Sequence, residues 1–121
     1  MVSGAITVYG IPNCDTVKKA RVWLDEHGVA FAFHDFKKAG VDAALIEGWL
    51  ADVSIDALVN RRGTTWRALD DAHKASADTQ AGAIALLVAQ PSMIKRPVLS
   101  IGGRVAALGF DAAQYGELFA A

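Results

Sequence analysis

The fold of this chain is decided by one stretch of its sequence, Val8-Tyr9-Gly10-Ile11-Pro12-Asn13-Cys14-Asp15-Thr16-Val17-Lys18-Lys19-Ala20-Arg21. Residues 5–9 are mostly apolar or β-branched, which predicts a short buried strand. A glycine and a proline then indicate a tight loop. From Val17 to Leu24 the apolar residues recur with the spacing of a helix. Cys14, the only cysteine of the chain, is therefore expected where a strand ends and a helix begins.

This position has a chemical consequence for Cys14. The unpaired N–H groups at a helix N-terminus stabilise negative charge and so lower the pKa of a cysteine placed there. Asn13 is expected to be the N-cap and Asp15 to lie in the first turn, while Lys18 and Lys19 are further cations close in sequence. The alternative is that the lone cysteine is a small buried apolar residue. The strand–loop–helix placement favours a reactive thiol.

The composition excludes several classes of protein. The 121 residues, 53% of them hydrophobic, fit one domain with a real core and exclude disorder. The formal net charge of -1 gives no direct signal for nucleic acid or for an acidic membrane surface. We expect no membrane span and no secretory signal. One cysteine forms no intrachain disulfide and no zinc pattern, so we expect a cytoplasmic protein without a metal site.

The chain after the first helix alternates between strand and helix signals. Residues 29–36 predict a second strand, and a strand–helix–strand unit is expected to be parallel and right-handed. Residues 37–40 are expected to form a loop. The block from about 42 to 91 is expected to be mostly helical. The helix-capping residues expected there are Asp42, Thr65 and Asp78, and residues 54–59 are expected to form another short helix.

The strand signal returns near the C-terminus. Residues 98–101 and 104–108 flank Gly102-Gly103, which predicts a hairpin, and Asp111 is expected to cap a last helix. The order predicts an α/β fold with a four-stranded mixed sheet, in one domain (1–121) with a helical insertion at about 42–91. A cysteine at the first strand–helix junction of such a sheet is the arrangement of the thioredoxin-like fold.

Three basic residues and a proline are the other candidates for the site. Pro97 opens the third strand. In thioredoxin-like folds the proline before this strand is cis and lies beside the active cysteine, so the resemblance makes Pro97 a cis candidate; an ordinary trans bond is the alternative. Arg96 is then expected near the thiol, where a guanidinium lowers the pKa and binds an oxyanion or carboxylate. Arg61 and Arg62 end a predicted helix, and the sequence leaves open which of them faces the site, against the default of a solvated surface.

Three motifs together resemble the arsenate reductase-like (ArsC/Spx) family, most of all its YffB subgroup. They are Tyr9–Arg21, Asn60–Trp66 and Ile94–Val98, and the resemblance covers about residues 5 to 120. It implies that Cys14 matches the catalytic cysteine of the glutaredoxin-coupled arsenate reductases. It further implies an active-site loop with Asn13, Asp15 and Thr16, and an oxyanion site with Arg96 and with Arg62 or Arg61.

Two departures from the family pattern shape the expected function. A third arginine follows the last strand in true arsenate reductases, but residues 107–110 here contain none. Val17 stands where Spx-type regulators carry the second cysteine of a Cys-x-x-Cys pair. The resemblance therefore implies a glutathione-dependent thiol reductase with no bound cofactor, with glutathione as co-substrate and glutathione or glutaredoxin as partner. The alternatives are an arsenate reductase proper, an Spx-like regulator that binds the RNA polymerase alpha subunit, and an inert relative.

Overall fold

The computed structural model of the protein describes residues 4–119. Residues 1–3, on which the expectation of no secretory signal partly rests, and residues 120–121 lie outside the described part. The chain forms two compact units. The sheet unit comprises the residues through Ala39 and those from Arg96 onward, and the helical unit comprises residues 40–95. Between residues 4 and 119, no helix is long and apolar enough to cross a membrane.

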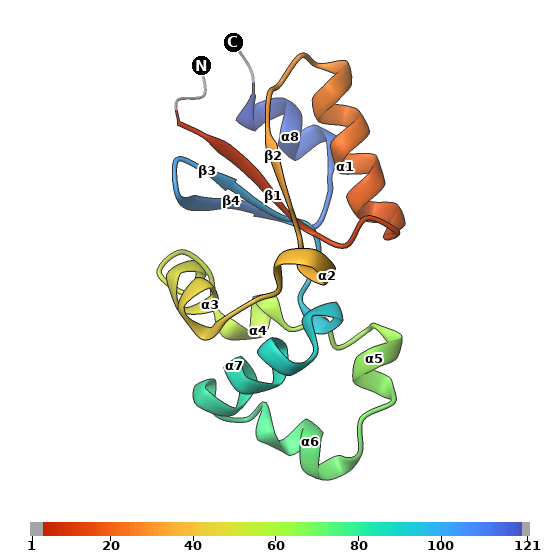
Figure 1. Ribbon diagram of the computed structural model, residues 1–121, viewed down its shortest axis with the longest axis vertical. Helices are drawn as coiled ribbons and strands as arrows, with labels where there is room; N and C mark the ends of the chain where they lie inside the picture. The colour runs from red at the N-terminus through yellow and green to blue at the C-terminus, as the bar shows by residue number, and fades with distance from the viewer. Residues whose placement is uncertain (1–3, 120–121) are drawn as a thin grey trace. The chain divides into compact units, whose positions relative to one another are not determined.

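The sheet unit contains a four-stranded mixed sheet in the order β2-β1-β3-β4 (Figure 1). Strand β1 (Ile6–Gly10) is followed by helix α1 (Asp15–Glu26) and by β2 (Ala32–Asp35), which pairs with β1 in parallel. Strand β3 (Val98–Ile101) is antiparallel to β1, and β4 (Arg104–Leu108) is antiparallel to β3. This confirms the predicted fold class, including the parallel strand–helix–strand unit.

Helices α1 and α8 (Ala112–Leu118) pack on the same face of the sheet (Figure 1). Successive side chains of a strand point to opposite faces, so residues at alternate positions share the face toward the helices. This core buries Val8, Leu99 and Ala107 from the strands, Ala20 and Leu24 from α1, and Tyr115 from α8. The helical spacing read from the sequence of α1 is therefore the spacing of its buried face.

The sequence predicts one of two local features of the sheet unit correctly and the other incorrectly. The Gly102-Gly103 hairpin is confirmed, with φ angles of 60° and 81° that only glycine adopts easily. The expected loop at 37–40 is wrong, because helix α2 (Phe36–Ala39) forms there. The Lys37 N–H donates to Asp35 Oδ1 at 2.8 Å, and Phe36 is buried. A side-chain acceptor before the first turn and a buried anchor thus favour a helix over a loop.

The helical unit is built around its most apolar helix. Its elements are α3 (Ala43–Trp49), α4 (Ile55–Leu58), α5 (Thr64–Arg67), α6 (Asp71–Ser76), α7 (Gln80–Ala89) and the 3-10 helix η1 (Pro91–Met93). Helix α7 contacts α3, α4, α6 and η1, and it buries Ala83, Ile84, Leu86 and Leu87 (Figure 1). A short antiparallel bridge between Val59 and Ile94 joins the end of α4 to the end of η1.

Of the three helix caps predicted in the helical unit, only Asp42 is confirmed, because its side chain accepts from the Leu45 N–H. The short helix expected over residues 54–59 is confirmed as α4, with Ser54 as its cap. Thr65 and Asp78 are not caps, because α5 begins after Gly63 and α7 begins after Thr79. Thr79 Oγ1 accepts from the Gly82 N–H at 3.1 Å. Helix α6 has no buried residue, so it carries no apolar periodicity from which it could have been predicted.

Candidate active site

Cys14 is the N-cap residue of α1 and lies directly after the loop that leaves β1. Its backbone is extended, with φ -91° and ψ 125°. Its N–H donates to the Ile11 carbonyl at 3.2 Å, and its carbonyl accepts from the Lys18 N–H at 2.9 Å. The expectation that Asn13 is the N-cap is therefore wrong by one residue. Cys14 is partly exposed.

The register of the sheet brings Arg96 and Pro97 to this junction. Tyr9 stands opposite Val98 in the antiparallel β1–β3 pair. Because the two strands run in opposite directions, the residues just before β3 lie beside those just after β1. The Arg96–Pro97 peptide bond is cis. Pro97 is buried, and its carbonyl accepts from the Gly109 N–H at 2.9 Å.

The groups around the Cys14 sulfur act on its pKa in opposite directions. Partial burial raises the pKa of the thiol, whereas the nearby Val17 N–H lowers it. The Arg96 side chain lowers it through a hydrogen bond and its charge, and the Thr16 N–H adds a smaller effect. The lowering contributions outweigh burial, so the pKa lies below its ordinary value. Lys18 and Lys19, expected as further cations, are exposed and are not among these groups.

The sequence draws attention to Val17 for its apolar side chain and as the position of the second cysteine in Spx-type regulators, and not for its backbone. Its N–H is that of the third helical residue, one of the N–H groups that have no partner inside the helix. Placing the cap at Cys14 instead of Asn13 would have predicted that this N–H lies near the sulfur. Asp15 is exposed and Thr16 is partly buried in the same first turn. The thiolate is thus stabilised mainly by a backbone N–H and by Arg96.

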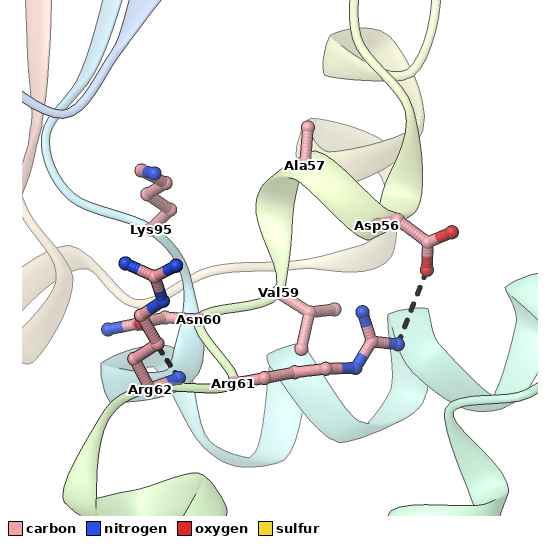
Figure 2. A pocket seen from close by; sticks show the side chains of 7 residues that line it. All are labelled: Asp56, Ala57, Val59, Asn60, Arg61, Arg62 and Lys95. Atoms are coloured by element: carbon pink, nitrogen blue, oxygen red, sulfur yellow. Dashed lines mark hydrogen bonds and ion pairs between the residues drawn. The ribbon is translucent and has the colours of Figure 1, made fainter.

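The second basic cluster lies in the helical unit and lines a pocket of about 380 Å³. Figure 2 shows Arg62 and Lys95 on one side of it and Arg61 extending to the other. Arg61 Nη2 lies 3.2 Å from Asp56 Oδ1, and its guanidinium lies over the Trp66 ring, 5.2 Å from the centroid. The remaining lining residues are Ala57, Val59 and Asn60. Arg61 is therefore held by a carboxylate and an indole.

Arg62 is anchored through its backbone instead of its side chain. The Arg62 N–H donates to Asn60 Oδ1 at 3.3 Å. Among the described residues its guanidinium makes no ion pair, which favours Arg62 over Arg61 as the anion-binding arginine of this pair. That either one faces Cys14 stays a prediction. Within residues 4–119, no group of three or more His, Cys, Asp or Glu side chains is placed to hold a metal ion.

The fold and the cysteine position together define a thioredoxin-like protein with one cysteine at the β1–α1 junction, beside an arginine and a cis-proline. The family model described as the ArsC family matches residues 9–118. The chain belongs to the ArsC family. This confirms the resemblance seen in the three sequence motifs.

Individual proteins are similar to this chain over nearly their whole length. An uncharacterized protein of Haemophilus influenzae is 43% identical over 115 residues, which cover 95% of this chain and 99% of that protein. A solved structure of a protein named YffB is 50% identical, with a TM-score of 0.88, over 96% of this chain and 100% of that chain. A solution structure of an arsenate reductase related protein from Brucella melitensis is 46% identical, with a TM-score of 0.76, over 98% of both chains.

Proposed function

We propose that this protein is an arsenate reductase-like thiol reductase that depends on glutathione. The observation that carries the proposal is the pairing of the Cys14 sulfur with the Arg96 side chain at the start of α1. A thiolate is the attacking form of cysteine in thiol–disulfide exchange. Membership of the ArsC family supports an oxidoreductase. The reaction is proposed to run in the cytoplasm, where free thiols are kept reduced.

The proposed reaction has two exchange steps. The Cys14 thiolate attacks the glutathione sulfur of a mixed disulfide R–S–SG, which forms a Cys14–glutathione disulfide and releases the thiolate RS⁻. The thiolate of a second glutathione then attacks the glutathione sulfur of this adduct, which yields GSSG and regenerates the Cys14 thiolate. The net change is R–S–SG + GSH → RSH + GSSG. A thiol of lowered pKa is also a better leaving group in the second step.

The residues have distinct proposed roles in this reaction. Arg96 stabilises the thiolate and binds an anionic group of the substrate, for which its planar fork is suited. Arg62, with Arg61 as the less favoured choice, is proposed to bind a glutathione carboxylate. Cys14 is the only cysteine of the 121 residues, so the resolving thiol comes from outside, from glutathione or from glutaredoxin.

The first test is the pH dependence of Cys14 alkylation by iodoacetamide. We expect the rate to rise through a pKa below the free value of about 8.5, and we expect GSSG to yield a glutathione adduct by mass spectrometry. The Cys14→Ser variant is the negative control. Turnover is measured with a glutathionylated peptide, coupled to glutathione reductase. A normal thiol pKa together with no adduct and no peptide reduction would overturn the proposal.

Arg96 is tested against a matched arginine of the same unit. Arg96→Ala is expected to raise the pKa of Cys14 and to slow peptide reduction. Arg104→Ala removes an exposed arginine at the other end of β3, beside the hairpin, and is expected to change neither. Equal effects of the two substitutions would contradict the role of Arg96.

Two alternative functions, that of an arsenate reductase proper and that of an Spx-like regulator, are tested in parallel assays. Within the sheet unit, Arg21 lies over the Phe33 ring at 4.1 Å, and residues 107–110, where β4 ends, contain no arginine. We therefore expect arsenate to be a poor substrate when it replaces the mixed disulfide. An Spx-like regulator would instead retain the C-terminal domain of the RNA polymerase alpha subunit at micromolar concentration, with Cys14→Ser behaving like wild type.

A further inference from the structure

Gly10 and Val17 are packed against each other at the junction that carries Cys14. Gly10 is the last residue of β1 and is buried. A Cβ added to Gly10 would lie 2.7 Å from Val17 Cγ2 and 3.3 Å from Val17 Cγ1. Val17 is fully buried, and a β-branched side chain in a helix has essentially one allowed rotamer. The valine therefore has no room to turn away, and its methyl groups rest directly on the glycine backbone.

This contact connects the end of β1 to the first turn of α1. Val17 is the third helical residue after the N-cap Cys14. In the same residue, the backbone N–H stabilises the sulfur of Cys14. Because side chain and N–H belong to one rigid helical turn, a displacement of the valine methyl groups also displaces the N–H.

We propose that Gly10 and Val17 are positioning residues for Cys14: the packing of the Val17 side chain on the Gly10 backbone fixes the first turn of α1 against the end of β1, and so keeps the Val17 N–H near the sulfur. The inference rests on the proposed function in one respect, since it takes Cys14 to be the reacting group. Neither residue touches the reactants. The role is to fix the direction of a hydrogen-bond donor.

A pair of substitutions moves the methyl volume from one side of the contact to the other. Gly10→Ala adds a Cβ that overlaps Val17, and Gly10 has no positive φ that would strain alanine by itself. Val17→Ala removes the methyl groups that rest on Gly10. Combined, the two substitutions place a small side chain on each side and restore a contact. Residues in direct contact are expected to show non-additive effects of this kind.

The experiment measures the alkylation pKa of Cys14 with iodoacetamide in wild type, Gly10→Ala, Val17→Ala and the double variant. Each single substitution is expected to raise the pKa of Cys14, and the double variant is expected to return toward wild type. Gly48→Ala is the control, because a Cβ at this exposed position of α3 meets no atom within 4 Å, and its pKa is expected to equal that of wild type.

Urea unfolding of each variant shows that the measured protein is folded. If Gly10→Ala does not fold, Val17→Ala and the double variant decide the question alone. A Cys14 pKa that is unchanged in Val17→Ala, or that rises further in the double variant, would overturn the inference. A coupled pKa pattern without any reduction of glutathionylated peptide would support the positioning role and would sink the proposed reductase function instead.

Discussion

Replacing Gly82 with alanine is expected to destabilise the protein, although alanine is the better residue for a helix. Gly82 is the third residue of α7. A Cβ there would overlap the Ser76 carbonyl oxygen and would lie 2.9 Å from Thr79 Oγ1. Helix propensity favours alanine by about 0.5–1 kcal/mol. Forcing extra volume against a fixed backbone costs about 1–3 kcal/mol, and loosening the Thr79 cap costs about 1 kcal/mol more. The net loss is therefore about 1–3 kcal/mol.

The assay is urea unfolding followed by circular dichroism, with Gly48→Ala as the matched control. Gly48 also lies within a helix, but a Cβ at this position meets no atom within 4 Å. The control is expected to gain up to about 1 kcal/mol from helix propensity alone. The reasoning is refuted if Gly82→Ala is as stable as wild type, or if the two alanine variants shift the unfolding free energy in the same direction.

The remaining predictions concern a cap and a buried hydroxyl. Thr79→Ala is expected to cost about 1 kcal/mol in urea unfolding and Asp78→Ala close to nothing; the reverse order would show that α7 is capped by Asp78 after all. Burial raises the pKa of Tyr115 from 10.0 to about 12, so the folded state holds this proton more tightly than the unfolded state. The resulting stabilisation is full below about pH 10 and is lost as the pH rises toward about 12, by roughly 3 kcal/mol in total. The Tyr115→Phe variant has no hydroxyl to ionise, so its unfolding free energy is expected to fall less than that of wild type between about pH 9 and pH 11. If the two proteins lose unfolding free energy equally over this range, the raised pKa of Tyr115 is contradicted.

The parts of the fold that the sequence predicts are those with a strong local pattern. The buried face of α1 repeats at helical spacing, and Gly102-Gly103 between two apolar runs has few alternatives to a hairpin. Short helices are harder to predict from the sequence, because α2 depends on a cap at Asp35 and on the burial of one phenylalanine. The choice between two neighbouring capping residues is harder still to predict. Thr79 and Asp78 are both good capping residues, so the residue types alone do not decide between them. The close approach of Gly82 to Ser76 depends on the tertiary structure.

The candidate site was predictable where it depends on the order of the strands. The thioredoxin-like fold predicts that Arg96 lies near the cysteine, and in the structure the pairing of β1 with β3 brings it there. The contribution of the Val17 N–H was not anticipated, because a one-residue error in the N-cap hides it. The sequence alone does not show which of Arg61 and Arg62 faces the site. Their contacts in the structure distinguish them, because Arg61 is held by Asp56 and Trp66 and the Arg62 side chain by neither.

The insertion of residues 40–95 between β2 and β3 has a consequence for how the chain folds. Strands β1 and β3 are hydrogen-bonded neighbours that lie roughly 90 residues apart, so their pairing must close a long loop at an entropic cost. Helical contacts within residues 40–95 are local and shorten that loop once they form. We therefore expect amides of α7 to gain protection from hydrogen exchange before those of β3 during refolding. The central strand pair, although it holds the reactive cysteine in place, would then be among the last parts of the protein to assemble.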